Sequence, residues 1–201
     1  TVTQVFIRGI GQTSDAETND PAVATNIDGV YASRFTLSGS LFDVERVEVL
    51  YGPQGTLYGR NAAGGAVNVT TKLPDFAFGG EGLVEYGNYN YLHGFAAANL
   101  PVSDELALRV AVDAAQRDGF ISNGQNDLDS LAGRLSARWE PTEALSVVAR
   151  AEVQKADSDG DSLIVRPLLD PDDPWFQPAA RGEDYYSRRK VQKYSAEINY
   201  D

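Results

Sequence analysis

The sequence has no cysteine, no methionine and a single histidine, His93. Without cysteine the chain can form neither a disulfide framework nor a thiolate metal site, and one histidine leaves little scope for zinc chemistry. The chain opens at Thr1 within a strand-like run, "TVTQVFIRG", and shows neither a charged start nor the apolar core of a signal peptide. We therefore expect an internal piece of a longer protein.

Positive charge and long apolar runs are also scarce. The 17 Lys and Arg residues stand against 29 Asp and Glu residues, and the net charge of −12 argues against binding to nucleic acid. No run approaches the roughly 18 to 20 apolar residues of a membrane helix, which excludes a helical span but not a membrane β-barrel, whose strands alternate. No paired carboxylates of defined spacing and no nucleophile with a histidine base can be assembled, so we expect no enzyme, no bound metal and no cofactor.

What the sequence does contain, beyond residue 79, is a series of alternating segments. In 105–116, 130–140, 144–154 and 191–200, apolar side chains occupy one set of alternate positions, and largely charged or small ones occupy the other. This period of two is typical of β-strands with two different faces. Residues 80–100 indicate two further strands around a turn near 88–90. The sequence thus predicts six strands, too few to close a barrel, since about eight is the smallest natural number.

The connections between these strands alternate in length from residue 100 onward. "PVSDE" and "EPTEA" are short, "RDGFISNGQNDLD" is medium, and a long connection runs from about Ala156 to Arg189. Outer-membrane barrels pair short periplasmic turns with long extracellular loops, and a strand of about ten or eleven residues is long enough to cross the bilayer. Trp139 and Tyr200 at strand ends would fit an interfacial aromatic girdle. An ordinary soluble antiparallel sheet with one wet face is the alternative.

A glycine-rich segment, "VERVEVLYGPQGTLYGRNAAGGAVNVTTK" (44–72), precedes the alternating strands. A phosphate-binding P-loop would need a lysine after its second glycine, but Gly65 stands at that place. "IRGIGQTS" fails as a dinucleotide fingerprint because Ser14 replaces the third glycine. We interpret the segment as two strands joined by a tightly packed turn, with glycines that permit positive φ and close packing.

Three motifs, in this order, resemble one family. "VFIRGIG", "NIDGVY" and "LFDVERVEVLYGPQGTLYGRNAAGGAVNVTTKLP" are similar to the C-terminal part of the plug domain of TonB-dependent outer-membrane receptors, followed by the start of their barrel. The resemblance implies a mixed α/β plug segment at 1–74 and antiparallel transmembrane β-barrel strands at 75–201, about six of an expected 22. It also implies localisation in the outer membrane of a Gram-negative bacterium.

The resemblance implies transport, not catalysis. Such receptors import scarce nutrients, most often ferric siderophores and sometimes haem, cobalamin or glycans, and TonB drives them by pulling on a short N-terminal box. The expected partners are the nutrient, TonB and outer-membrane lipid. That box, the early plug and about sixteen strands are missing from these residues, so we do not expect the piece alone to transport. A carbohydrate-binding or adhesive β-domain, with the glycine-rich part as a linker, is the rival hypothesis.

The resemblance also assigns candidate contacts between plug and barrel. Arg8 matches the plug arginine of the family's I-R-G motif, which is usually paired with barrel acids by charge-assisted bonds. A simple exposed arginine at a strand end is the alternative. Many relatives carry Arg before the Gly-Pro pair, where this chain has Tyr51, and Arg60 is the candidate replacement.

For ligand contact, the matching regions are the apical plug loops at about 12–23 and 32–42. Arg34 and Phe35 are the preferred contacts because a cation and an aromatic ring suit an anionic, ring-bearing chelate. Polar loops of this composition are by default merely solvated.

The long connection contains "DSDGD" (157–161), which resembles the opening of a calcium loop. Ser162 stands at the required glycine and Leu168 at the closing glutamate, which excludes an EF-hand. We expect a solvated extracellular loop, with "DDPWFQP" folding over the entrance.

Overall fold

The computed structural model describes residues 4–11, 21–33, 37, 41–59, 61–121, 124–159 and 186–201. The chain divides into two compact units, Thr1–Lys72 and Leu73–Asp201. Within the described ranges, no helix has both the length and the apolar character that crossing a membrane requires.

The first unit consists mainly of strands. A small hairpin pairs β1 (Phe6–Ile7) with β2 (Ile10–Gly11), and a four-stranded sheet has the order β4-β3-β6-β5. Its strands are β3 (Val23–Ile27), β4 (Val30–Tyr31), β5 (Val44–Tyr51) and β6 (Gly65–Thr71). β3 and β6 pair in parallel and the other neighbours are antiparallel. Every residue of β3 is buried, as expected for a strand at the centre of a mixed sheet.

The turn between β3 and β4 follows directly from the sequence "NIDGVY". Asp28 and Gly29 have φ values of 51° and 77°, so both central residues of this two-residue hairpin are left-handed. Asp-Gly is a favoured pair for such a turn because Asp tolerates positive φ and Gly adopts it at no steric cost. The hairpin presents the Asp28 carboxylate to the end of β6.

The glycine-rich segment behaves partly as predicted. β5 and β6 pair antiparallel, and Gly65 has φ of 146°. A Cβ at Gly65 would overlap the carbonyl oxygen of Leu50 and come within 2.8 Å of Ile7 Cδ1, which confirms the close-packing role. The connection between the two strands is longer than a simple turn, because it spans residues 52–64 and includes a short helix, α2 (Gly55–Tyr58). With this four-residue helix, the helical share of the mixed α/β plug segment is small in the described residues.

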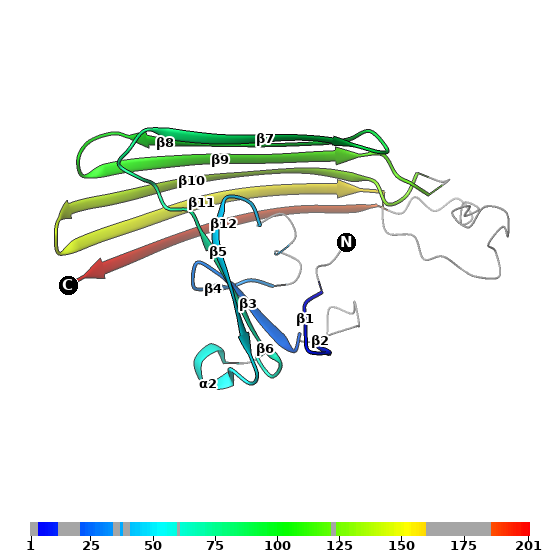
Figure 1. The fold of residues 1–201 in the computed structure, drawn as a ribbon, viewed down its shortest axis with the longest axis horizontal. Helices are drawn as coiled ribbons and strands as arrows, with labels where there is room; N and C mark the ends of the chain where they lie inside the picture. Colours follow the sequence, from blue (N-terminus) through cyan, green and yellow to red (C-terminus); the bar gives the residue numbers. More distant parts are fainter. Residues whose placement is uncertain are drawn as a thin grey trace. The chain divides into compact units, whose positions relative to one another are not determined.

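The second unit is one antiparallel sheet, in which every strand pairs with its neighbours in sequence order. Its strands are β7 (Gly79–Gly87), β8 (Tyr91–Pro101), β9 (Leu106–Arg117), β10 (Leu128–Thr142), β11 (Leu145–Ser158) and β12 (Ser187–Tyr200). Figure 1 shows them side by side, from dark green β7 to red β12. The prediction of six strands is confirmed. β10, β11 and β12, with 15, 14 and 14 residues, are longer than the predicted ten or eleven.

The connections of this sheet fall at two ends. Residues 102–105 and 143–144 connect strands at one end, and 88–90, 118–127 and 159–186 connect them at the other. The predicted separation of short from long connections is right from residue 100 onward. The tight turn at 88–90 nevertheless shares its end with the long connections. Its Tyr89 and Asn90 are left-handed, and the Asn90 amide donates to Asp118 Oδ2 at 2.6 Å, so the turn is tied to the start of the next connection.

Candidate functional site

The two faces of the six-stranded sheet have opposite exposure and opposite chemistry. On β10, Leu131 and Leu135 are each 49% exposed, whereas the alternate Arg134 and Ser136 are 3% and 2% exposed. A soluble sheet with one wet face would bury its leucines and expose its arginines. The predicted alternation is therefore confirmed, and the apolar face is the exposed one. We call it the apolar face and the other the polar face.

The same inversion extends across β9 and β11. Apolar side chains such as Val110, Val112 and Val153 are exposed by 38 to 43%, while Arg109, Arg150 and Glu152 are buried. Residues opposite one another in register share a face of a sheet. Exposed leucine and valine next to buried arginine are the arrangement of a sheet whose apolar face meets lipid.

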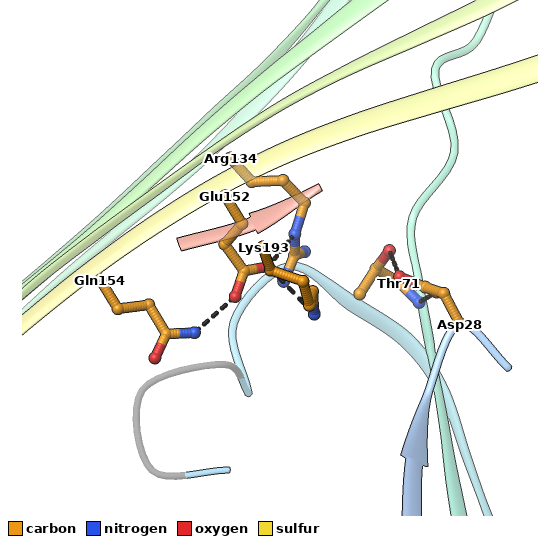
Figure 2. Close-up of polar contacts among 6 residues, drawn as sticks. All are labelled: Asp28, Thr71, Arg134, Glu152, Gln154 and Lys193. Carbon is orange, nitrogen blue, oxygen red and sulfur yellow. Dashed lines mark hydrogen bonds and ion pairs between the residues drawn. The ribbon is translucent and has the colours of Figure 1, made fainter. Parts of the chain in front are cut away.

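A buried carboxylate organises the centre of the polar face. Glu152 on β11 accepts a hydrogen bond from Arg134 Nε on β10 at 2.7 Å, and its Oε2 lies 3.6 Å from Lys193 Nζ on β12. The Gln154 amide also donates to Glu152 Oε1. Figure 2 shows these side chains converging on the carboxylate. We call Arg134, Glu152, Gln154 and Lys193 the Glu152 network.

The register of the strands builds this network. Arg134 lies directly opposite Glu152, and Glu152 lies directly opposite Lys193. The Arg134 and Glu152 side chains are each 2% exposed. An ion pair so deeply buried is tolerated only with good geometry and additional hydrogen bonds, both of which Glu152 has.

Two further ion pairs on the polar face involve arginines in the row next to that of the Glu152 network. Arg109 donates to Glu81 Oε1 on β7 at 2.7 Å and to Asn99 Oδ1 on β8 at 3.1 Å. Arg150 NH1 lies 3.8 Å from Glu197 Oε2 on β12. Paired charges of β7, β9, β10, β11 and β12, together with Asn99 of β8, thus cover the polar face. Such a face suits a polar interior rather than an apolar core.

His93 lies on the same face and has two acidic partners. Its Nδ1 is 2.7 Å from Glu85 Oε2 on β7, and its Nε2 is 2.8 Å from Asp113 Oδ2 on β9. No partner of this histidine is evident from the sequence alone, because Glu85 is its cross-strand neighbour and Asp113 its diagonal one, and both depend on the register between strands. The ring links three strands. Across the described ranges, no group of three or more His, Cys, Asp or Glu residues is arranged to hold a metal ion.

In the first unit, the Asp28 carboxylate joins the β3–β4 turn to β6. Its Oδ1 accepts from the Thr71 backbone N–H and its Oδ2 from the Thr71 hydroxyl, each at 2.9 Å (Figure 2). Asp28 N–H also donates to the Val69 carbonyl at 2.9 Å. Thr71 is fully buried. This arrangement fixes the last residues of β6, directly before the boundary between the units.

The predicted contact residues have different outcomes. Arg8 is exposed, has φ of 50°, and its guanidinium carbon lies 4.8 Å from the centre of the Tyr51 ring. The structure thus brings together Arg8 and the residue that stands before the Gly-Pro pair. Arg60, Arg34 and Phe35 lie outside the described residues, as do residues 160 and 161 of the segment 157–161.

Known proteins resemble this chain in sequence and in fold. Residues 1–66 match the family model of the TonB-dependent Receptor Plug Domain. The pesticin receptor of Yersinia pestis is 42% identical over 71 residues, which are 35% of this chain and 10% of that receptor. The ferrioxamine receptor of Yersinia enterocolitica is 30% identical over 117 residues, which are 58% of this chain and 16% of that receptor. The chain therefore spans between a tenth and a sixth of these relatives.

Solved structures share the fold across both units. The ferric yersiniabactin uptake receptor FyuA from Yersinia pestis aligns with a TM-score of 0.77 and 24% identity, covering 90% of this chain and 30% of that one. The ferripyoverdine receptor of Pseudomonas aeruginosa aligns with a TM-score of 0.68 and 17% identity, covering 87% of this chain and 25% of that one.

A small mixed sheet followed by antiparallel strands with an exposed apolar face defines the class of plugged β-barrel receptors. Within that class, residues 1–66 match the plug domain of the TonB-dependent receptors, and the chain resembles the plug segment and first barrel strands of such receptors.

Proposed function

We propose that this chain is part of an outer-membrane receptor that imports a ferric siderophore. The observation that carries the proposal is the inverted exposure of the six-stranded sheet, with leucines outward and the Glu152 network buried. A sheet of this kind is stable when lipid covers its apolar face and a polar interior covers the other. The receptor would lie in the outer membrane of a Gram-negative bacterium.

The assignment of a siderophore as the substrate is based on the names of the relatives. Their names include a ferrioxamine receptor and a ferric yersiniabactin uptake receptor. We propose TonB as the partner that supplies energy, acting on the plug, with 1–74 as plug and 75–201 as barrel. Arg34 and Phe35 are the proposed ligand contacts, and Arg8 and Arg60 the proposed contacts between plug and barrel.

Growth on defined nutrients tests the substrate. A strain lacking the gene is grown under iron limitation with a panel of iron chelates and haem, and separately on cobalamin or oligosaccharides as the limiting nutrient. The proposal expects loss of growth on one or more ferric siderophores, with restoration by the intact gene. Loss only on a glycan, on cobalamin or on haem would overturn the siderophore assignment.

Membrane residence is tested independently of the substrate. The complete receptor should require detergent for extraction from outer membranes. A receptor that purifies as a soluble monomer without detergent would favour a carbohydrate-binding or adhesive β-domain instead.

A further inference from the structure

Two lysines face each other at one edge of the apolar face. Lys155 on β11 lies directly opposite Lys190 on β12, and both side chains are exposed. Like charges directly opposite each other on antiparallel strands are destabilising. In the described part of the chain, no acidic group lies within ion-pair distance of either ammonium. The neighbouring row holds Arg188, Asp157 and Asp129, and Arg188 is paired with Asp157 at 3.1 Å.

The position of the lysines along the strand is informative. On β11 the apolar face carries Leu145, Val147, Ala149, Ala151 and Val153, and then Lys155. The eight residue steps from Leu145 to Val153 cover about 26 Å along the strand, or roughly 20 Å when tilted by 45°. This height is comparable with the apolar band of about 25 Å in membrane barrels. The lysines therefore lie at the boundary of the band, on the side of the long connections.

A hollow lies beside the lysine pair on the same face. It has a volume of about 460 Å³, and Gly94, Ala114 and apolar side chains that include Val84, Leu92 and Leu131 line part of it. The polar residues Gln116, Asp129 and Ser130 line other parts of it. Val84 is 78% exposed and Leu131 49%. Gly94, Ala114, Leu131, Lys155 and Lys190 follow one another in register across five strands. The apolar part of the hollow and two cations thus share one row of the sheet, while Asp129 borders the hollow in the next row of the same face.

We propose that this row binds a phosphate-bearing lipid, with its phosphate between Lys155 and Lys190 and an acyl chain in the hollow at Gly94. The inference rests on the proposed function, because only a membrane-embedded sheet presents this face to lipid. A phosphate relieves the repulsion between the two ammonium groups, and the lysine stems lie along apolar surface while their charged ends reach the headgroup level. A free phosphate ion would satisfy the lysines and leave the hollow unused.

Lipid titration of the complete receptor in detergent tests this site. Binding of phosphatidylglycerol and of a galactosyl diacylglycerol with the same acyl chains is followed by native mass spectrometry. The variant K155Q/K190Q should lose about 25-fold in affinity for phosphatidylglycerol, roughly fivefold for each lysine, and keep its affinity for the galactolipid. The matched variant K155R/K190R, which retains both cations, should bind phosphatidylglycerol like the parent receptor.

A second variant tests the hollow independently of the charges. A Cβ at Gly94 would meet nothing within 4 Å, so Gly94→Val fits the sheet and fills the hollow. It should weaken binding of both lipids severalfold. Unchanged phosphatidylglycerol affinity in K155Q/K190Q, or its complete displacement by millimolar inorganic phosphate, would overturn the lipid site. Neither result touches the proposed function, which fails instead if the receptor needs no detergent.

Discussion

At the scale of single residues, Glu152 is the side chain on which the polar face most depends. Its single carboxylate is the ion-pair partner of both Arg134 and Lys193, and its own side chain is 2% exposed. Removing one member of a buried ion pair leaves an uncompensated charge, which costs about 3–5 kcal/mol. A more distant pair on the same face, whose acid is exposed, should cost much less, and Arg150 with Glu197 is such a pair.

We predict that Glu152→Gln lowers the free energy of unfolding of the receptor by about 3 kcal/mol, because two cations lose their shared counter-charge. The matched control is Glu197→Gln, whose side chain is 54% exposed and lies 3.8 Å from Arg150. That change should cost under about 1 kcal/mol. Urea unfolding of the detergent-solubilised receptor measures both, and equal costs would contradict the central place of Glu152.

Asp28 gives a second prediction at this scale. Asp28→Ala removes the acceptor of the Thr71 N–H and strains a left-handed position, so the end of β6 should open more often. The expected loss is about 2 kcal/mol, with a matching rise in hydrogen exchange at the Thr71 amide. Asp28→Asn keeps the turn and should lose less. Unaltered hydrogen exchange at the Thr71 amide in the alanine variant would show that the Asp28–Thr71 hydrogen bonds do not hold the end of β6.

At the scale of elements, β10 shows what sequence reasoning could and could not provide. The alternation of Leu131 and Leu135 with Arg134 predicted two faces, because side-chain direction in a strand depends only on parity. Which face is buried was left open, since the same pattern fits a soluble sheet. The pairing of Arg134 with Glu152, and of His93 with Glu85, required the register between strands, which no local pattern specifies.

The plug segment shows the same limit. The hairpin turn at "NIDGVY" depends on two adjacent residues, Asp28 and Gly29, and is therefore a local feature of the sequence. The parallel pairing of β3 with β6, and the helix α2 between β5 and β6, depend on contacts between distant residues. Strand lengths were underestimated because β10, β11 and β12 continue past the apolar band into polar ends.

Two leucines on β10 provide a prediction at this scale. Leu135 lies in the middle of the apolar band, and Leu131 lies in the row of Lys155, yet each is 49% exposed. Leu135→Lys should destabilise the bilayer-inserted receptor by about 2–4 kcal/mol and Leu131→Lys by about 0–1, because the cost of a charge depends on membrane depth. Unfolding from lipid vesicles measures the difference. A soluble sheet would give equal costs for the two variants.

At the scale of the whole molecule, the proposed receptor must hold its plug and keep its barrel strands in lipid. We predict that Arg8→Ala weakens retention of the plug, which should appear as greater sensitivity of cells to large antibiotics and as altered siderophore uptake. Tyr51→Leu removes only the ring beneath Arg8 and should have a smaller effect, about 0.5–1 kcal/mol at an exposed site. Unchanged leakage and uptake in Arg8→Ala would count against its role.

The central claim, that the exposed apolar face meets lipid, can be tested residue by residue. The chain has no cysteine, so single cysteines can be introduced at 131–137 of β10 and labelled in the receptor reconstituted into lipid bilayers. Accessibility of the labels to a lipid-soluble quencher is then compared with accessibility to a water-soluble one. The account predicts a period of two, with labels at 131, 133, 135 and 137 quenched from lipid and those at 132, 134 and 136 protected. Loss of that alternation, or its reversal, would contradict it.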